Sequence, residues 1–355
     1  AGAVAITGSH NPGDWNGFKL GLGKGSLYGD AIQHLRQLIE TEDFAVGQAG
    51  LETVDLYPDY LGWVGEHLRL GPKPIKVVVD AGNGTGGLVG PALYRALGAE
   101  VIELFCEPDG DFPNHHPDPT VEENLADLKA AVAAHGADLG IAYDGDADRI
   151  GAVAPDGRVL WGDQLLLLFA RDILTRHPGA KFVAEVKCSR VLYDGIAAAG
   201  GDAEMWQVGH SLIKARMKET GALLAGEMSG HLFFADDFFG FDDAPYVGAR
   251  LIELLSRGQV TLAGFLDGLP QTVTTPELRV DCPDDAKFDL VQKAVAHFSA
   301  RYPVNPIDGA RISFPEGWGL IRASNTQPVL VMRFEAPTAQ ALAAYRGEVE
   351  AWLAA

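Results

Sequence analysis

Short, largely apolar runs alternate with amphipathic stretches along most of the chain. The runs at 75–79, 101–105, 138–142 and 182–186 are typical of strands in a covered sheet, and several of them end in polar residues. Apolar residues spaced three and four apart fill many of the intervals between such runs and indicate helices. This alternation of strands and helices predicts an α/β fold built from consecutive βαβ units.

The pattern changes at two places and so divides the chain. The segment 71–74 contains a glycine and two prolines, which end the helix predicted over 56–68. From residue 272 onward, strands with few helices between them predict a small antiparallel α+β domain. From its length we expect four compact units, at residues 1–54, 55–157, 158–271 and 272–355.

A polar turn directly follows the first apolar run. Residues 3–6 predict a buried strand, and the turn at 7–12 places Ser9 at the end of that strand. His10 and Lys19 lie within one loop of the Ser9 hydroxyl, so Ser9 could carry a covalent group and be served by acid or base neighbours. An ordinary serine in a surface turn explains the same residues equally well.

The net charge of −20 limits the possible partners. With 28 basic and 48 acidic side chains, the protein repels polyanions over most of its surface, and no basic stripe is visible. Nucleic acid and anionic membranes are therefore not expected as partners, and no apolar run approaches the length needed to span a bilayer. The three cysteines are far apart and odd in number, which favours reduced thiols in a cytoplasm.

Three carboxylates follow one of the predicted strands. Asp144, Asp146 and Asp148 stand at alternate positions, so their side chains should converge on one side of a tight loop. Three such charges repel unless a cation sits among them, and an all-oxygen set with open positions suits Mg²⁺ that also meets a phosphate. An EF-hand is excluded, because Arg149 and Pro155 stand where that loop needs glycine and glutamate. A solvated acidic turn is the alternative.

Two further loops collect polar side chains after strands. Glu227, Ser229 and His231 offer an acceptor, a hydroxyl and an imidazole on a glycine-hinged turn, a set suited to vicinal sugar hydroxyls. The segment 322–328 collects a guanidinium, two hydroxyls and an amide between two apolar strands. Such donors beside turn N–H groups predict a phosphate site in this acidic protein.

A glycine-rich turn suggests a competing function. Gly82, Gly84 and Gly87 match the dinucleotide-binding fingerprint after a strand, and Glu103 lies where a ribose-binding acid would be expected. Asp80 argues against a bound dinucleotide, because its carboxylate would stand beside the pyrophosphate. An NAD-dependent oxidoreductase nevertheless remains an alternative of a different class.

Taken together, the motifs resemble those of a known family. In this order, residues 7–12, 144–149, 226–231 and 322–328 are similar to loops of the α-D-phosphohexomutases, specifically of the bacterial phosphomannomutase/phosphoglucomutase branch. Connecting stretches also resemble that branch, at residues 16–19, 112–119, 208–214 and 317–320. The resemblance covers essentially the whole chain, but family members carry further residues ahead of the serine loop. The resemblance therefore implies an α/β fold of consecutive doubly wound, mixed-sheet domains around a central cleft, plus a C-terminal antiparallel α+β domain, with the first domain incomplete here.

The resemblance implies an isomerase that interconverts hexose 1-phosphates and hexose 6-phosphates of glucose, mannose or both. It implies that Ser9 becomes a phosphoserine and that a hexose 1,6-bisphosphate, such as glucose 1,6-bisphosphate, is the intermediate. The implied cofactor is Mg²⁺. Its implied ligands are Ser9, Asp144, Asp146 and Asp148.

The resemblance also implies roles for the remaining site residues. Lys19 and His231 are the acid/base candidates, and Arg149 would follow the transferring group. Glu227 and Ser229 would read sugar hydroxyls, while the 322–328 loop and its helpers would hold the phosphate that does not react. The substrate-binding candidates are His10, Lys187, Arg190, His210, Lys214, Glu227, Ser229, Arg322, Ser324, Asn325 and Thr326.

Two other activities remain open at this point. A phosphoglucosamine mutase would need a hydrogen-bond acceptor near the amino group of the sugar. Met228 argues mildly against that activity, because it stands in the 226–231 loop, hereafter the sugar loop, where a polar residue would serve better. A phosphatase would use the same phosphoenzyme and metal but would release inorganic phosphate. We expect small hexose phosphates as partners of a cytoplasmic monomer.

Overall fold

The computed structural model describes residues 2–9, 11, 14–23, 25–325 and 327–355. His10 and Thr326, two of the substrate-binding candidates, lie outside the described residues. Among the described helices, none is both long enough and apolar enough to cross a membrane. The three cysteines are free thiols, and Cys188 and Cys282 are buried.

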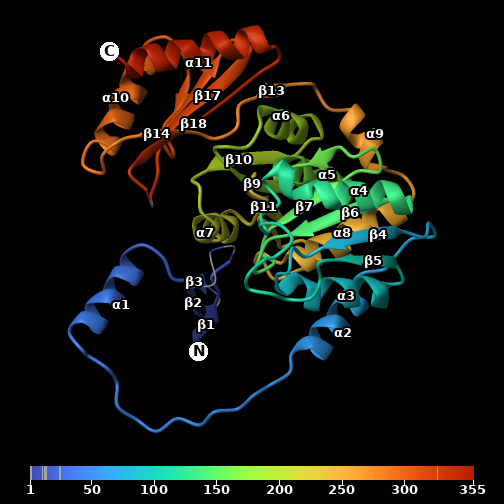
Figure 1. Ribbon diagram of the computed structural model, residues 1–355. Coiled ribbons are helices and arrows are strands. Elements are labelled where there is room, and N and C mark those ends of the chain that lie inside the picture. The colour runs from blue at the N-terminus through green and yellow to red at the C-terminus, as the bar shows by residue number, and fades with distance from the viewer. Residues whose placement is uncertain (1, 10, 12–13, 24, 326) are drawn as a thin grey trace.

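The first unit is a small antiparallel sheet with one helix. Its strands are β1 (Gly2–Ile6), β2 (Phe18–Leu22) and β3 (Gly25–Ser26), and its helix is α1 (Asp30–Glu40). The sequence correctly predicts strand β1 but not its burial, because Val4 and Ile6 are 59% and 69% exposed. Within the described residues, no packed layer covers this apolar strand. The segment 43–56, which has no helix or strand, joins α1 to the second unit (Figure 1).

The second unit is the βαβ arrangement that the sequence predicts, extended by an antiparallel edge. The sheet order is β5-β4-β6-β7-β8, with β5, β4 and β6 parallel and β7 and β8 antiparallel. Gly98 ends α3 at φ 102°, the left-handed cap expected of a glycine there. The elements are α2 (Tyr57–His67), β4 (Lys76–Asp80), η1 (Thr85–Leu88), α3 (Gly90–Leu97), β5 (Glu100–Leu104), η2 (Glu122–Leu125), α4 (Ala126–His135), β6 (Leu139–Tyr143), β7 (Ile150–Val153) and β8 (Val159–Leu160).

The third unit repeats this plan with a sheet of order β10-β9-β11-β12, in which only β12 is antiparallel to its neighbour. Its elements are α5 (Gly162–Arg176), β9 (Lys181–Glu185), α6 (Arg190–Ala198), β10 (Asp202–Trp206), α7 (His210–Thr220), β11 (Leu224–Gly226), β12 (Leu232–Phe234), α8 (Ala244–Ser256) and α9 (Leu262–Asp267).

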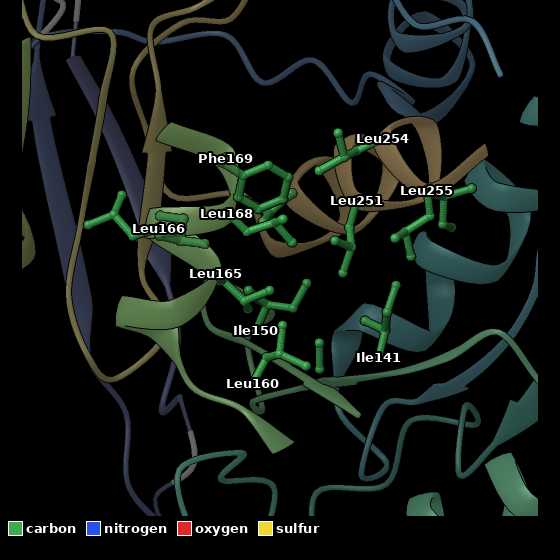
Figure 2. Close-up of a cluster of buried hydrophobic side chains, with 14 of the residues drawn as sticks. Ile141, Ile150, Leu160, Leu165, Leu166, Leu168, Phe169, Leu251, Leu254 and Leu255 are labelled. Carbon is green, nitrogen blue, oxygen red and sulfur yellow. The ribbon is translucent and has the colours of Figure 1, made fainter. Parts of the chain in front are cut away.

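One hydrophobic core serves both the second and the third unit. Leu165 and Phe169 of α5 and Leu251 of α8 belong to the same buried cluster as Ile141 of β6 and Ile150 of β7 (Figure 2). Helix α8 also packs on α3, where a Cβ on Gly248 would lie only 1.9 Å from the Tyr94 hydroxyl. The two sheets are therefore joined by buried apolar surface, which is the dominant stabilising contribution in such contacts.

The last unit is antiparallel, as the sequence predicts, and has its own core. The sheet order is β13-β18-β17-β16-β15, and β14 also pairs with β18. Helices α10 and α11 pack on this sheet, and α11 lies at the outer edge of the molecule (Figure 1). The elements are β13 (Val273–Thr274), β14 (Leu278–Asp281), α10 (Lys287–Ser299), β15 (Val304–Asn305), β16 (Ala310–Phe314), β17 (Gly317–Ala323), β18 (Val329–Ala336) and α11 (Ala339–Leu353).

Two arginines of the last unit donate hydrogen bonds to the segment that directly follows β9 in the third unit. The buried Arg311 donates to the carbonyls of Val186 and Cys188, and Arg333 donates to the carbonyl of Lys187 at 3.0 Å. These guanidinium contacts, further hydrogen bonds such as that from the Val208 N–H to Asp308, and a small apolar cluster around Trp318 join the two units.

Candidate active site

The Ser9 hydroxyl points at the carboxylate loop of the second unit. Its Oγ donates to Oδ2 of Asp144 at 3.2 Å, and the Ser9 N–H donates to the Thr7 hydroxyl at 2.8 Å. Thr7 in turn donates to Oδ2 of Asp146 at 2.9 Å. Ser9 has a φ of 51°, in the left-handed region that residues with a side chain rarely occupy, and such strain is typical of functional turns. The turn after β1 therefore presents the hydroxyls of Ser9 and Thr7 to the acidic loop.

Asp144, Asp146 and Asp148 converge, as their alternate spacing predicts. Between β6 and β7, each offers a carboxylate oxygen, and these oxygens lie within 4.8 Å of one another. Oδ1 of the buried Asp144 accepts from the N–H groups of Asp148 and Arg149 at 3.1 and 3.0 Å. Burial raises the pKa of Asp144 to about 7; Arg149 opposes this rise and the two other carboxylates add to it.

This donor set fits a hard divalent cation. Oδ1 of Asp146 is buried and has no hydrogen-bond partner, which is an unfavourable state unless a cation is bound there. Lys19 supplies part of the positive charge, since its Nζ lies 2.7 Å from Oδ2 of Asp146 and also pairs with Asp148. Burial alone would lower the pKa of Lys19, but the two carboxylates raise it, so the lysine remains a cation.

A cavity of about 620 Å³ opens over these groups. Ser9 and Lys19 line it from the first unit, and Asp146 and Asp148 line it from the second. Asp242 of the third unit completes this acidic wall. The volume lies within the range of small-molecule sites, and a cleft between units is a usual place for one.

Arg149 is fixed rather than free to follow a group. Its Nε donates to Oδ2 of Asp144 at 2.8 Å, its Nη1 lies 3.3 Å from Asp118, and the residue is only 8% exposed. The side chain lines a different cavity, of about 880 Å³, together with Lys187 and Ser229. The geometry of Arg149 therefore suits a residue that orients Asp144, which differs from the expectation drawn from the sequence.

His231 lies among three carboxylates. Its Nδ1 is 3.2 Å from Oδ2 of Asp242 and 3.6 Å from Oδ1 of Asp148, and its Nε2 is 4.0 Å from Glu227. Burial alone would lower the pKa of His231, but these carboxylates raise it to about 9. Lys214 donates to the other oxygen of Asp242 at 2.9 Å.

His210 stacks on His231, with ring centroids 5.7 Å apart, but it differs from that residue in charge. Burial and the nearby Lys214 lower its pKa. His210 and Lys214, both substrate-binding candidates, are thus held beside His231 by the shared partner Asp242.

Hydrogen bonds also hold the residues of the 226–231 loop in place. Glu227 is buried, its Oε1 accepts from the Gly209 N–H at 2.7 Å, and the Ser229 hydroxyl donates to its Oε2 at 3.3 Å. The Met228 N–H donates to Oε1 of Glu185 at 3.0 Å. Lys187 reaches Glu185 at 3.7 Å from the end of β9, so it stands next to the sugar loop.

The predicted phosphate loop lies on the last unit, away from Ser9. Arg322 pairs with Asp308 at 3.1 Å, and the same Asp308 oxygen accepts from the Val208 N–H of the third unit at 3.0 Å. Ser324 is buried, its hydroxyl accepts from the Gln327 N–H at 3.2 Å, and Asn325 is exposed. No contact joins Arg322 directly to the Ser9 group among the described residues.

One substrate-binding candidate turns away from these loops. The Arg190 guanidinium pairs with Asp194 at 2.9 Å on the outside of α6, and the Arg190 backbone N–H donates to Glu335 of the last unit at 3.1 Å. This i to i+4 pairing is the local arrangement that a helix surface favours, and it leaves the guanidinium away from the phosphate loop.

Several residues of this network were not identified from the sequence. Asp242 is the main example. It directly precedes Asp243, which caps α8 by accepting from the Tyr246 N–H, so in the sequence the two aspartates indicate only the start of a helix. Glu185 and Asp308 were also missed, and nothing in the local pattern of Asp308 distinguishes it from a surface acid. A polar residue at the end of the apolar strand β9 was the one available signal for Glu185.

The glycine turn does not have the geometry of a dinucleotide site. Asp80 accepts from the Gly82 N–H at 2.9 Å and pairs with His115 at 3.1 Å. A Cβ on Gly87 would lie 2.0 Å from the Cys106 carbonyl, so this glycine is needed for chain packing. Glu103 pairs with Arg95 on the surface.

Family models for the phosphoglucomutase/phosphomannomutase family match nearly the whole chain. Alpha/beta/alpha domain I matches residues 1–46, domain II residues 59–157, domain III residues 161–273, and the C-terminal domain residues 277–351. Similar curated proteins include a phosphomannomutase/phosphoglucomutase of Pseudomonas aeruginosa, 49% identical over 340 residues, which cover 96% of this chain and 73% of that protein. A phosphoglucomutase of Neisseria gonorrhoeae is 49% identical, with 96% and 74% covered.

The fold is similar to a solved structure of a phosphoglucomutase/phosphomannomutase family protein from Burkholderia thailandensis. The TM-score is 0.91 at 44% sequence identity, and the match covers 98% of this chain and 75% of the other. The match of all four domains and the identity to these relatives agree with the arrangement of the loops described above. The chain therefore belongs to the phosphoglucomutase/phosphomannomutase family.

Proposed function

We propose that this protein is a phosphohexomutase that interconverts hexose 1-phosphates and 6-phosphates through a phosphoryl group carried on Ser9. One observation carries the proposal: Ser9 Oγ lies 3.2 Å from Asp144, in a loop where three carboxylates offer oxygens within 4.8 Å of one another. A hydroxyl on a strained turn, aimed at a site that fits a divalent cation, is suited to phosphoryl transfer.

The reaction consists of two transfers that balance without water. In the first, the bond between phosphorus and Ser9 Oγ breaks, and a bond forms between phosphorus and the free hydroxyl of the sugar phosphate. The hydroxyl loses a proton, Ser9 gains one, and the product is a hexose 1,6-bisphosphate. In the second transfer, the other phosphoryl group of this intermediate returns to Ser9.

Asp144, Asp146 and Asp148, together with a Ser9 oxygen, would hold Mg²⁺. When bound, the ion neutralises negative charge on the transferring phosphoryl group. Arg149 orients Asp144 from behind through its 2.8 Å contact. Lys19, held between two carboxylates and always charged, adds a second cation on the Ser9 side of the cavity.

His231 is the group that exchanges the proton of the sugar hydroxyl. Its Nδ1 faces Asp242 and Asp148, so Nε2 is the nitrogen left on the side of Glu227 and the sugar. Because its pKa is raised to about 9, His231 holds a proton at neutral pH. It donates this proton to the sugar oxygen when the phosphoryl group returns to Ser9; in the opposite direction, the small fraction of His231 that is neutral accepts the proton of the sugar hydroxyl.

The phosphate that does not react would bind on Arg322, Ser324 and Asn325. A bidentate guanidinium with nearby hydroxyl and amide donors suits a phosphate group, and Arg322 is 7% exposed, so water competes weakly there. The incoming phosphate must replace Asp308 as the partner of Arg322.

Glu227 and Ser229 would contact the sugar hydroxyls that glucose and mannose share. These sugars differ only at carbon 2, and Met228 offers no side-chain acceptor for an amino group there. A loose or apolar contact discriminates such epimers by about 1–3 kcal/mol, whereas an obligatory hydrogen bond discriminates by orders of magnitude. We therefore propose that both glucose and mannose phosphates are substrates, ahead of glucosamine phosphate.

The decisive experiment is peptide mass spectrometry of the isolated protein, together with kinetics of Ser9→Ala. Phosphate is expected on Ser9, and Ser9→Ala should be inactive, while Ser299→Ala at the exposed end of α10 should behave as wild type. Phosphate on another residue, or an active Ser9→Ala variant, would contradict the assignment. Release of inorganic phosphate in place of isomerised sugar phosphate would indicate a phosphatase.

Substrate choice is tested by comparing kcat/KM for glucose 1-phosphate, mannose 1-phosphate and glucosamine 1-phosphate. Similar values for the first two, with a lower value for the third, are expected. A clear preference for the amino sugar would instead favour a phosphoglucosamine mutase.

A further inference from the structure

The glycine turn at 82–87 directly contacts the carboxylate loop. The Thr85 N–H donates to the carbonyl of Gly145 at 2.9 Å, and the Thr85 hydroxyl donates to the same carbonyl at 3.3 Å. Gly145 stands between Asp144 and Asp146 in the sequence. One carbonyl of the acidic loop is thus held by two donors from a single threonine.

The close approach depends on residues without side chains. A Cβ on Gly84 would lie 2.7 Å from the Gly145 carbonyl oxygen and 2.9 Å from its Cα. A Cβ on Gly86 would lie 2.4 Å from the Tyr143 ring and 3.2 Å from the Cβ of Ala147. Both glycines therefore make room for the acidic loop, and no ligand is needed to explain them.

The turn is itself firmly anchored to the second sheet. Asp80 accepts from the Gly82 N–H at 2.9 Å, and the Asn83 N–H donates to the Phe105 carbonyl at 2.8 Å. The Asn83 side chain donates to the carbonyl of Glu107 at 2.8 Å. These contacts give the turn a fixed position from which it can hold the loop.

A second backbone contact holds the loop from the third unit. The carbonyl of Ala147 accepts from the Ala244 N–H, at the start of α8, at 3.1 Å. The carbonyls of residues 145 and 147 are therefore both bonded to the scaffold, while the carboxylates of residues 144, 146 and 148 gather together. Neutral hydrogen bonds of this kind oppose the mutual repulsion of the three carboxylates.

We propose that Thr85 is a positioning residue for the divalent-cation site, holding Gly145 so that Asp144 and Asp146 stay at the separation needed for binding. The inference rests on the proposed function, because it takes the carboxylate loop as the cation site. Thr85 does not need to touch the substrate. It acts through the loop backbone, as groups behind metal ligands commonly do.

The probe is Mn²⁺, an oxygen-preferring divalent ion, titrated into the full chain and followed by electron paramagnetic resonance of the free ion. Thr85→Val keeps the shape and the N–H but removes the hydroxyl, and we expect it to weaken Mn²⁺ binding about threefold to fivefold. Thr85→Ser restores the hydroxyl and should bind within about twofold of wild type. Gly84→Ala should weaken binding by about tenfold or more.

The control is Thr175→Val. The Thr175 hydroxyl also donates to a backbone carbonyl, that of Asp172 at 2.7 Å, but it lies near the end of α5. This variant should bind Mn²⁺ as wild type does. Thermal unfolding of each variant checks that the protein remains folded under the conditions of the titration.

The possible outcomes are distinct. Unchanged Mn²⁺ affinity in Thr85→Val, or an equal loss in Thr85→Ser, would overturn the positioning role even if Asp146→Asn abolishes binding. In that case the cation site and the proposed function would still stand. Wild-type protein that binds no Mn²⁺, or binding that Asp146→Asn does not affect, would reject both.

Discussion

Replacing Asp242 with asparagine should lower the pKa of His231. Oδ2 of Asp242 lies 3.2 Å from Nδ1 of His231, and both atoms are buried without an aligned hydrogen-bond partner. The pair is therefore an ion pair, and it opposes the burial that would otherwise keep the imidazole neutral. Asparagine keeps the size of the side chain and removes its charge.

The size of the effect follows from the raised pKa. The difference between the ordinary value of 6.5 and about 9 corresponds to about 3 kcal/mol in favour of the protonated imidazole. Asp148 and Glu227 also favour the protonated imidazole, so Asp242→Asn should remove only part of this free energy. We expect the pKa of His231 to fall by at least about one unit. At pH 7.5, wild-type His231 is about 97% protonated, against about 9% for a histidine at its ordinary pKa.

The assay is NMR titration of protein with isotope-labelled histidine rings, in the presence of a chelator so that no metal perturbs Asp148. The His231 signal is identified by its loss in His231→Gln. We expect a midpoint near 9 in wild type and a lower one in Asp242→Asn. Asp237→Asn, on the exposed part of the same loop, should leave the midpoint unchanged.

The same pair predicts how stability depends on pH. Because the folded pKa of His231 is raised, its contribution to stability is fully present below about pH 6.5 and is lost as pH rises through about 9. Asp242→Asn should therefore destabilise the protein more at pH 6 than at pH 10, in urea unfolding experiments. A wild-type midpoint near 6.5, or a midpoint that Asp242→Asn does not move, would refute the reasoning.

Three further changes test other parts of the structure. Arg322→Gln should raise KM for hexose phosphate at least tenfold in steady-state kinetics, because a charged hydrogen bond to phosphate is worth about 1.5–3 kcal/mol; an unchanged KM would argue against this phosphate site. Asp236→Ala leaves Arg250, which is 4% exposed, without its main partner, and urea unfolding should show a loss of about 3–5 kcal/mol. Gly87→Ala forces a Cβ within 2.0 Å of the Cys106 carbonyl and should cost about 3 kcal/mol or more, whereas Gly110→Ala, with open space around it, should be neutral.

Local patterns predict most of the elements of this fold. The apolar run at 75–79, the glycine cap at Gly98 and the next run define one βαβ unit, and β4, α3 and β5 occur as expected. The convergence of the three carboxylates also follows from local spacing. The burial of β1 was wrongly predicted, because an apolar run reveals strand propensity but not whether another layer packs against it.

Tertiary contacts of the site could not be read from the sequence. Asp242 and His231 are eleven positions apart, and their approach depends on how the loop between β12 and α8 folds. The fixed position of the Arg149 side chain depends on its ion pair with Asp118, which lies in a loop much earlier in the chain. That α8 covers the second sheet depends on close contacts such as the one between Gly248 and Tyr94. No periodicity encodes such pairings.

The shared core of the second and third units determines which distances in the site can change. The Ile150 N–H, just after the carboxylate loop, donates to the Gly230 carbonyl of the sugar loop at 3.2 Å, and both loops stand on the same apolar interior. Separating them would expose that interior to water, so the carboxylate loop and the 226–231 loop are expected to move as one body. Ser9 and Arg322 are carried by separate units, which attach through hydrogen bonds and, for the last unit, a small apolar cluster around Trp318, so less buried apolar surface holds them in place. If the proposed bisphosphate intermediate turns end for end, the units that carry Ser9 and Arg322 would be the ones to move, while the two loops on the shared core would keep their relative position.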